Sequence, residues 1–367
     1  MPAERLSIGD RKILEILKVL DRRQKLLVLD EPTASFTTEE TRRLLAILTE
    51  LKAEGTAILY VTHRLEEIEG MVDRVMVLRD GAKVGELTHA EARQERVVSL
   101  MVGRELGQMY PHPASPPGGV LFSTRGIGRA SAYEDVTLDV RQNEIVALVG
   151  LAGHGSFEVA RAIAGLMPPE KGEMAMEGRA VKLATLRAAL RQGIGFLAED
   201  RADTILRVRT VRENLALGAL EMWSRMGFVD RAREADEANK LIKALAVRTA
   251  SPTALAESLS GGNQQKLALG RWLAAERKLL VLLDPTAGVD VGARAEIYKH
   301  LRNFADGGRG VVVATSDLAE ALGLADRVIA FYRGRQVATF TREDRNEEEV
   351  LAAITGQTIA AHGGTSA

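Results

Sequence analysis

The sequence predicts an α/β fold built from two copies of one unit. Segments with the period of an amphipathic helix alternate with short apolar strands such as KLLVL at residues 25–29, a pattern typical of parallel sheets covered by helices. The chain also repeats itself, because the segment from Leu6 matches the segment from Leu259 without a gap. A third observation is the turn GLAGHGSF at residues 150–157, which joins a strand-like run to a helix-like run, as phosphate-binding loops do.

The internal repeat has an offset of 253 residues. Leu6 begins LSIGDRKILEILKVLDRRQKLLVLDEPTA, and Leu259 begins LSGGNQQKLALGRWLAAERKLLVLLDPTA. The register continues until near Val84 and Val337. Each copy therefore predicts, in order, a helix, a buried strand, a second helix, a second buried strand and a short strand pair.

Domain boundaries follow from the repeat and from one segment rich in proline and glycine. Residues 106–119 read LGQMYPHPASPPGG, which cannot continue a helix or a sheet and predicts a linker. The expected organisation is a first copy over 1–105, a second copy over 120–345 and a tail over 346–367. The first copy has five residues ahead of its LSIG, so we expect its front to be missing and to be encoded upstream.

Composition predicts a soluble globular protein and excludes several classes. The 367 residues include 49 basic and 50 acidic side chains, so no overall field favours nucleic acid. The chain has no cysteine, which suits a reducing cytoplasm. No apolar run approaches the roughly 18 residues of a membrane helix, and the first ten residues lack a signal-peptide core. Any work at a membrane is therefore expected from outside the bilayer.

Several motifs occur together in the second copy. LSGGNQQK at 259–266, followed by an apolar strand and DPTAGVDVGAR, resembles the signature, Walker B and D-loop of ATP-binding-cassette (ABC) ATPases. FLAEDR at 196–201 and the region near Ser316 stand where that family has its Q-loop and switch. The tandem arrangement is similar to the fused ATPase subunit of bacterial monosaccharide importers of the ribose and galactose type. The resemblance implies a P-loop ABC fold with a truncated first copy and a helical subdomain over 202–257.

The resemblance also implies a function. The chain would bind ATP and Mg²⁺ and hydrolyse ATP by in-line attack of water, coupling this to monosaccharide uptake. Its partners would be integral-membrane permease subunits and, indirectly, a solute-binding protein, with the chain peripheral on the cytoplasmic face of the cell membrane. Alternatives are a nucleoside importer of the same layout, and a noncatalytic nucleotide-binding scaffold or truncated inactive subunit. A soluble translation-factor type is disfavoured because the linker here is short and proline-rich.

Two cassettes of this family pack head to tail, so each nucleotide site combines both copies. In site one the resemblance assigns Asp30 to magnesium, Glu31 to the attacking water and His63 to the γ-phosphate. Facing them is the signature of the second copy, at the start of a helix whose free N–H groups attract phosphate. Its phosphate-facing residues are expected to be Ser260, Gly261, Gly262 and Gln264.

In site two the phosphate loop keeps its glycine spacing, but Ser156 replaces the lysine and Phe157 replaces the magnesium-binding hydroxyl. The repeat register places Leu283, Asp284 and Ser316 where site one has Asp30, Glu31 and His63. We therefore predict a retired site kept mainly for architecture. The residues that could still form an anion-binding nest there are Gly150, Gly153, Gly155 and Ser156.

Further expectations concern single residues. Glu199 replaces the Q-loop glutamine, and its carboxylate would repel phosphate. His154 is expected to be a solvated loop residue. Tyr133 could stack on adenine but lies close to the loop for that role. Asp30 and Glu31 have an alternative reading as a helix N-cap pair ahead of TTEETRRLL.

Overall fold

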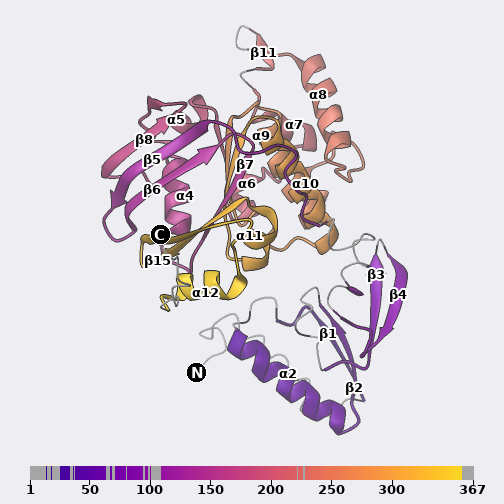
Figure 1. Cartoon of the computed structure of the whole chain (residues 1–367). Helices are drawn as coiled ribbons and strands as arrows, with labels where there is room; N and C mark the ends of the chain where they lie inside the picture. Colours follow the sequence, from indigo (N-terminus) through magenta and orange to yellow (C-terminus); the bar gives the residue numbers. More distant parts are fainter. Residues whose placement is uncertain are drawn as a thin grey trace. The chain divides into compact units, whose positions relative to one another are not determined.

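The structure is a computed structural model. It describes residues 14, 18, 25–33, 36, 38–62, 67, 71–79, 81–93, 96–97, 100, 109–220, 222–225 and 228–357. The chain forms two compact units, Met1–Leu106 and Gly107–Ala367, each of which is described by itself (Figure 1).

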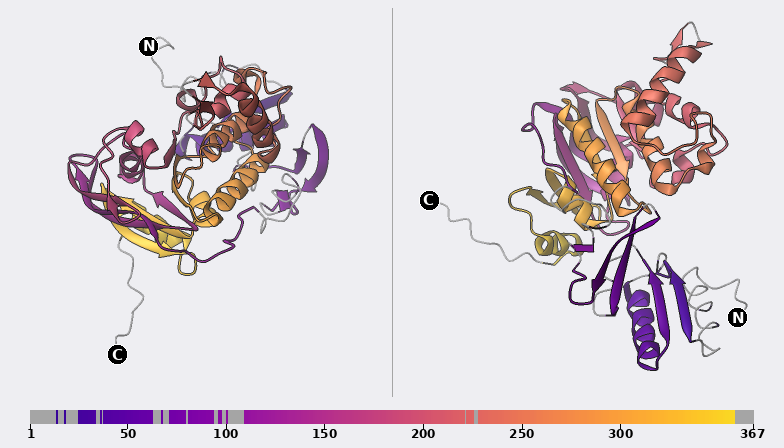
Figure 2. Two further views of the ribbon diagram at one scale, coloured as in Figure 1. Left: turned by 90° about the horizontal axis from the view of Figure 1, so that it is seen from above. Right: turned by 90° about the vertical axis from the view of Figure 1, so that its right-hand side faces the viewer.

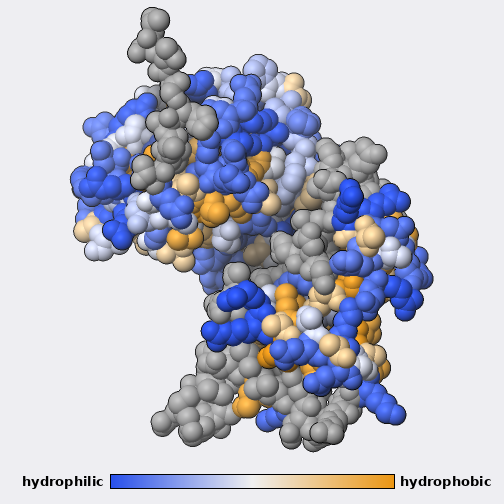
Figure 3. Space-filling view, turned by 60° about the horizontal axis from the view of Figure 1, so that its bottom comes forward, coloured by the Kyte–Doolittle hydropathy of each residue, from blue (hydrophilic) through white to orange (hydrophobic). Residues whose placement is uncertain are grey.

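The described residues of the first unit include helix α2 and two small sheets. Strands β1 and β2 pair in parallel, and β3 and β4 pair antiparallel. Their bounds are β1 Leu26–Asp30, α2 Thr38–Ala53, β2 Ala57–Val61, β3 Arg74–Arg79 and β4 Ala82–Thr88. Leu27, Leu29 and Phe36 form a core with Leu44 and Leu48 of α2, so only one face of β1 is covered. Figure 3 shows apolar side chains at the surface of this unit, in the lower part of the view.

The second unit is built on a six-stranded sheet of order β10-β13-β14-β7-β15-β16. All neighbours pair in parallel except β15 and β16. The strand bounds are β7 Glu144–Val149, β10 Ile194–Leu197, β13 Leu279–Leu283, β14 Gly310–Ala314, β15 Arg327–Tyr332 and β16 Arg335–Thr341. Strands β13, β14 and β7 are buried along their whole length and are apolar except for Glu144 at the start of β7, as expected for a parallel sheet covered on both faces.

A second, antiparallel sheet has the order β6-β5-β8-β9. Its strands are β5 Val120–Arg129, β6 Tyr133–Arg141, β8 Lys171–Met176 and β9 Arg179–Ala180. Helix α4, Ser156–Ile163, shares one core with both sheets, because Val159 and Ile163 cluster with Phe122 of β5 and Val281 of β13. The strand–turn–helix unit around residues 150–157 is thereby held rigidly in the unit.

The remaining elements are mostly helices. They are α5 Leu186–Arg191, α6 Arg201–Thr204, α7 Val211–Ala216, β11 Ser224–Arg225, β12 Phe228–Val229, α8 Arg231–Ala244, η4 Ala256–Ser258, α9 Gly261–Leu273, α10 Val291–Asp306, α11 Leu318–Leu324 and α12 Glu347–Thr355. Figure 2 shows the helices of residues 201–245 gathered at one side of the sheet. This matches the helix-rich character expected for residues 202–257. No described helix is long and apolar enough to cross a membrane.

The two units share one geometry at the offset of 253 residues. Leu26 pairs with Ala57 as Leu279 pairs with Gly310. The bounds of β3, β4 and α2 match those of β15, β16 and α10 at the same offset. Even the irregularity after Val77 in β3 has its counterpart after Ala330 in β15. The sequence repeat is therefore also a repeat of strand register.

Both copies also contain the same buried hydrogen bond. Thr33 donates its hydroxyl to Oε1 of Glu67 at 2.6 Å, and Thr286 donates to Oε1 of Glu320 at 2.6 Å. Each bond joins the turn that follows one parallel strand, β1 or β13, to the segment that follows the neighbouring strand, β2 or β14. The register thus extends to side-chain contacts.

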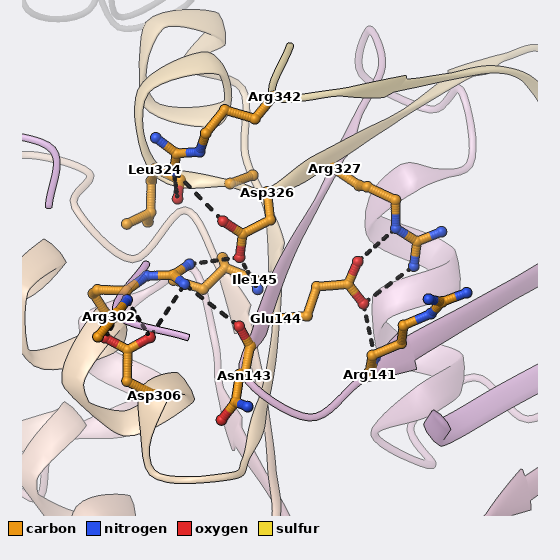
Figure 4. Close-up of polar contacts among 12 residues, drawn as sticks. Arg141, Asn143, Glu144, Ile145, Arg302, Asp306, Leu324, Asp326, Arg327 and Arg342 are labelled. Carbon is orange, nitrogen blue, oxygen red and sulfur yellow. Dashed lines mark hydrogen bonds and ion pairs between the residues drawn. The ribbon is translucent and has the colours of Figure 1, made fainter. Parts of the chain in front are cut away.

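A cluster of ion pairs secures the second unit at the strand ends opposite the glycine-rich turn (Figure 4). Arg302 of α10 is buried and donates to Asp326 at 2.7 Å, which also accepts the N–H of Ile145 at 2.8 Å. Arg327 donates from Nε to Glu144 at 2.5 Å. These contacts join α10, β7 and β15, and they satisfy charges that would be costly to bury alone.

Two parts expected to be a linker and a tail pack onto the second unit. Tyr110 stacks on Tyr298 with the ring centroids 5.1 Å apart, and burial raises the pKa of Tyr110 to about 12. Residues 347–355 form α12 and bury Val350, Ala353 and Ile354. Composition did not reveal this, because docking depends on apolar surface supplied by distant strands.

Candidate functional site

The glycine-rich turn at residues 150–156 has the backbone of a phosphate loop. It follows β7 and precedes α4, and both Gly153 and Gly155 have positive φ angles, 76° and 104°. A Cβ on Gly155 would lie 3.0 Å from Cα of Gly334, so this position requires glycine. The first N–H groups of α4 have no side-chain cap, which leaves donors directed at the turn.

The side chains around this turn do not suit a magnesium nucleotide. Ser156 is buried and supplies no cation, and Phe157 packs against the apolar core. Leu283, at the end of β13, is buried in the same core and has no ligand atom for a metal. The residues therefore suit an anion, and neither Phe157 nor Leu283 offers a side-chain ligand for Mg²⁺.

Asp284 follows Leu283 and is already bonded. Ser316, after β14, donates its backbone N–H to Oδ1 of Asp284 at 2.8 Å and its hydroxyl to both carboxylate oxygens at 3.1–3.2 Å. The adjacent Thr315 donates its N–H to the carbonyl of Leu148 at 3.3 Å, which places this pair beside the strand that leads into the turn. The sequence placed both residues in one site but did not predict their bond.

Glu199 is also paired. Arg161 of α4 donates from Nη2 to both of its carboxylate oxygens, at 2.9 and 3.0 Å. The two residues are 38 positions apart, and no sequence pattern marks the pair. The expectation that Glu199 would repel phosphate needs correction, since Arg161 offsets much of its charge at short range.

A pocket of about 620 Å³ opens beside the turn. It is lined by Gly128, Arg129, Ala130, Ser131, Ala132, Tyr133, Glu134, Gly153, Glu170, Lys171, Arg333 and Gly334. Tyr133 does not offer its ring to a base, because it is buried and donates its hydroxyl to Met167 O at 2.9 Å. Burial also raises the pKa of Tyr133 to about 12. The adenine-stacking reading is therefore wrong.

His154 is half-buried rather than solvated. Its ring meets Tyr332 edge to face, with centroids 5.2 Å apart, and Nδ1 is buried without a hydrogen-bond partner in the described part of the chain. Its backbone carbonyl accepts the N–H of Gly334 at 3.0 Å. These contacts fix the turn in place, a role that its sequence context did not indicate.

The segment 259–266 begins α9 and presents a helix N-terminus. Ser260 is the exposed N-cap residue, and its side chain makes no capping bond. Instead its Oγ accepts a hydrogen bond from Asn263 at 2.8 Å. Gly262 approaches α10 so closely that a Cβ would lie 3.0 Å from Cβ of Ala293. Ser260 and the N–H groups of Gly261 and Gly262 are therefore the groups that a phosphate could reach.

Gln264 differs from the expectation made for it. It is buried, and its side-chain amide donates to the carbonyls of Ala256 at 3.3 Å and Leu259 at 3.1 Å. In this conformation it shapes the loop ahead of α9 and does not face outward. The reason is tertiary, because these carbonyls are brought over α9 by the turn at η4.

In the first unit, Asp30 ends β1 and Glu31 follows it, and both side chains are exposed. Glu31 has a φ of 43°, and its counterpart Asp284 has a φ of 40°. The two residues are not an N-cap pair, because α2 begins only at Thr38. His63 lies outside the described residues. The exposed carboxylates of Asp30 and Glu31 suit Mg²⁺, a hard cation that prefers oxygen ligands.

Comparison with known proteins agrees with this geometry. Residues 133–287 match the family model described as ABC transporter. The ribose import ATP-binding protein of Pseudomonas putida is 39% identical over 352 residues, covering 96% of this chain and 69% of that protein. A ribose import ATP-binding protein of Rubrobacter xylanophilus is 40% identical over 360 residues, covering 98% and 72%. The chain belongs to the ABC transporter family.

A solved ABC structure supports the fold over much of the chain. A nucleotide-free ATP-binding cassette from an ABC transporter aligns with a TM-score of 0.55, at 19% identity, over 64% of this chain and 96% of that one. ABC ATPases bind ATP with Mg²⁺, and the matched residues 133–287 include both the glycine-rich turn and residues 259–266. Within the described residues no group of three or more His, Cys, Asp or Glu could hold a metal by itself.

Proposed function

We propose that this chain is the ATP-hydrolysing subunit of a sugar importer, acting through separate membrane permeases. The observation that carries the proposal is the extended similarity to ribose import ATP-binding proteins, at 39–40% identity over nearly the whole chain. Ribose is therefore the first substrate to test. Substrate choice itself belongs to the permeases and the solute-binding protein, so a nucleoside importer of the same layout remains the second candidate.

The chemistry assigned to this chain takes place at one composite site. Asp30 would hold Mg²⁺, which neutralises developing charge on the phosphates when bound. Glu31 would accept a proton from the attacking water, and His63 would hydrogen-bond the γ-phosphate. Ser260 and the N-terminus of α9 would bind the phosphates from the opposite side. Asp30, Glu31 and Ser260 are exposed in the structure, and Gly261 at the start of α9 is partly exposed.

In this proposal the second phosphate loop has a structural role and no catalytic one. Its metal ligand is replaced by Leu283, its lysine by Ser156, and its acidic residue is bonded to Ser316. In the first copy, by contrast, Asp30 and Glu31 are retained, and in the second the signature is retained. The replaced residues thus all belong to one of the two sites. This distribution supports selection for one inactive site over random loss of function throughout the second copy.

The test is uptake in cells that carry the natural gene. Substituting Glu31→Gln in that gene should lower uptake of labelled ribose at least about 100-fold, because general-base catalysis contributes that much. Glu50→Gln on α2 is the matched exposed control and should leave uptake unchanged. Loss of uridine uptake with ribose uptake intact would favour the nucleoside importer. Unchanged uptake of every sugar and nucleoside would refute the catalytic role and favour a scaffold.

A further inference from the structure

The side chain of Asn263 lies in the first turn of α9 and makes hydrogen bonds in two directions. Its Oδ1 accepts the backbone N–H of Arg248 at 2.8 Å, and its Nδ2 donates to Oγ of Ser260 at 2.8 Å. Arg248 follows α8, and Ser260 is the N-cap residue of α9. One carboxamide therefore joins the segment after α8 to the residue that begins α9.

These two bonds fix the polarity of the carboxamide. A backbone N–H can only donate, so the atom of Asn263 that faces Arg248 must be the carbonyl oxygen. The amide nitrogen then faces Ser260, whose hydroxyl has to accept. The hydroxyl keeps its own proton, and within the described residues no acceptor takes that proton. Since Ser260 is exposed, its O–H is left to donate outward, away from Asn263.

The segment that follows α8 is itself held against α9. Lys266 is buried and donates from Nζ to the carbonyl of Ala246 at 3.2 Å. A Cβ on Gly270 would lie 2.5 Å from Cδ1 of Leu245, which is fully buried. Because Asn263, Lys266 and Gly270 are three and four residues apart, they share one face of α9. The N–H that orients Asn263 is thus supplied by backbone in a fixed position.

We propose that Asn263 is a positioning residue for Ser260. Its carboxamide holds the hydroxyl of Ser260 as an acceptor, so that the O–H donates outward to a phosphate oxygen beside the N-terminus of α9. Asn263 acts through Ser260 and needs no phosphate contact of its own. The inference rests on the proposed function, which assigns Ser260 to the phosphates, and adds the group that decides where the hydroxyl proton points.

Two substitutions separate the bonds of Asn263. Asn263→Ala removes both of them. Asn263→Asp has the same shape and can still accept the N–H of Arg248, but its second oxygen cannot donate. The hydroxyl of Ser260 then donates to the carboxylate, and its proton is directed inward and lost to phosphate. Both variants should therefore weaken phosphate binding, whereas only Asn263→Ala should release Arg248.

The functional test is steady-state hydrolysis of MgATP by the full-length subunit encoded by the natural gene. Asn263→Ala should raise KM about tenfold and keep kcat within about twofold, because the hydroxyl contacts phosphate in both the ground state and the transition state. Loss of folded protein would instead lower kcat and leave KM unchanged. Asn303→Ala, at an exposed asparagine of α10, is the matched control and should change neither constant.

A double-variant cycle shows whether Asn263 acts through Ser260. Ser260→Ala alone should raise KM about as much as Asn263→Ala alone. Adding Asn263→Ala to Ser260→Ala should change KM by less than about twofold, since the hydroxyl to be positioned is then absent. Additive effects of the two substitutions on KM would overturn the proposal.

A second measurement needs no nucleotide. Hydrogen exchange of the Arg248 amide in this chain should speed up at least about tenfold in Asn263→Ala and stay within about twofold of the parent in Asn263→Asp. Unchanged exchange in Asn263→Ala would overturn the proposal, because Asn263 would then not be held by Arg248. Failure of the proposed function has a different sign, namely hydrolysis that survives Glu31→Gln.

Discussion

Ser316 donates its backbone N–H to Oδ1 of Asp284 at 2.8 Å and its hydroxyl to the same carboxylate at 3.1–3.2 Å. The two residues stand where the first copy has Glu31 and His63. Three hydrogen bonds therefore occupy the carboxylate that would have to polarise water in an active site. These contacts support the proposal that the second phosphate loop is noncatalytic.

Removing this pair should not affect transport. Asp284→Asn and Ser316→Ala, each made in the natural gene, should keep ribose uptake within about twofold of the parent, because the proposed function assigns neither group to the reacting water. Glu31→Gln serves as the matched loss-of-function variant. If Asp284→Asn abolished uptake while Glu31→Gln preserved it, the assignment of the two sites would be reversed.

Restoring a cation should restore nucleotide affinity at the second loop. Ser156→Lys places an ammonium at the first residue of α4, and one charge-assisted contact is worth about 1.5–3 kcal/mol. We expect the Kd for a fluorescent ATP analogue to fall about 10- to 100-fold. Ser156→Met has similar length and no charge, so it should not tighten binding. Equal gains in both variants would mean that packing, and not charge, governs this loop.

In the glycine-rich turn at residues 150–156, substitution of Gly155 should lower the stability of the chain more than substitution of Gly153. Both have positive φ, but a Cβ at Gly155 meets Gly334 at 3.0 Å whereas a Cβ at Gly153 meets nothing within 4 Å. Gly155→Ala should lower the free energy of unfolding by about 2 kcal/mol or more, and Gly153→Ala by about 1 kcal/mol. Urea unfolding measures both. Equal losses would show that backbone conformation alone, without the contact to Gly334, determines the cost.

Glu320 makes the free energy of unfolding depend on pH. Burial raises the pKa of Glu320 above its usual value of 4.5, against the hydrogen bond from Thr286. The folded state thus holds this proton more tightly than the unfolded chain, so stability is lost as the pH rises from 4.5 through the raised pKa. Glu320→Gln does not titrate and keeps an acceptor for Thr286. Its unfolding free energy relative to the parent should therefore increase as the pH rises toward neutral.

The control for this pH effect is Glu343→Gln, at an exposed glutamate. Its stability relative to the parent should show little dependence on pH over the same range. Urea unfolding at several pH values checks both variants. A Glu320→Gln variant that lost stability as the pH rose would contradict the sign derived from burial.

The sequence alone revealed the repeat and showed which expected site residues are replaced in the second copy. An ungapped offset of 253 residues was enough to predict which strands would correspond, because strand period and register follow from local apolar patterns. It also identified Leu283, which has no ligand atom for Mg²⁺, and Ser156, which lacks the positive charge of the lysine it replaces, since both follow from side-chain type alone. The candidate site of the first unit was likewise read from Asp30 and Glu31 at the end of an apolar strand.

Only the tertiary structure decided how these residues are used. Gln264 faces inward and Arg161 pairs with Glu199 because segments far apart in the chain meet there. Val28 and Val281 stand in equivalent strands, yet one is 58% exposed and the other fully buried. Their local sequences, LLVLD and LLVLL, are nearly identical, so burial is decided by what packs against the strand, and that information lies in distant residues.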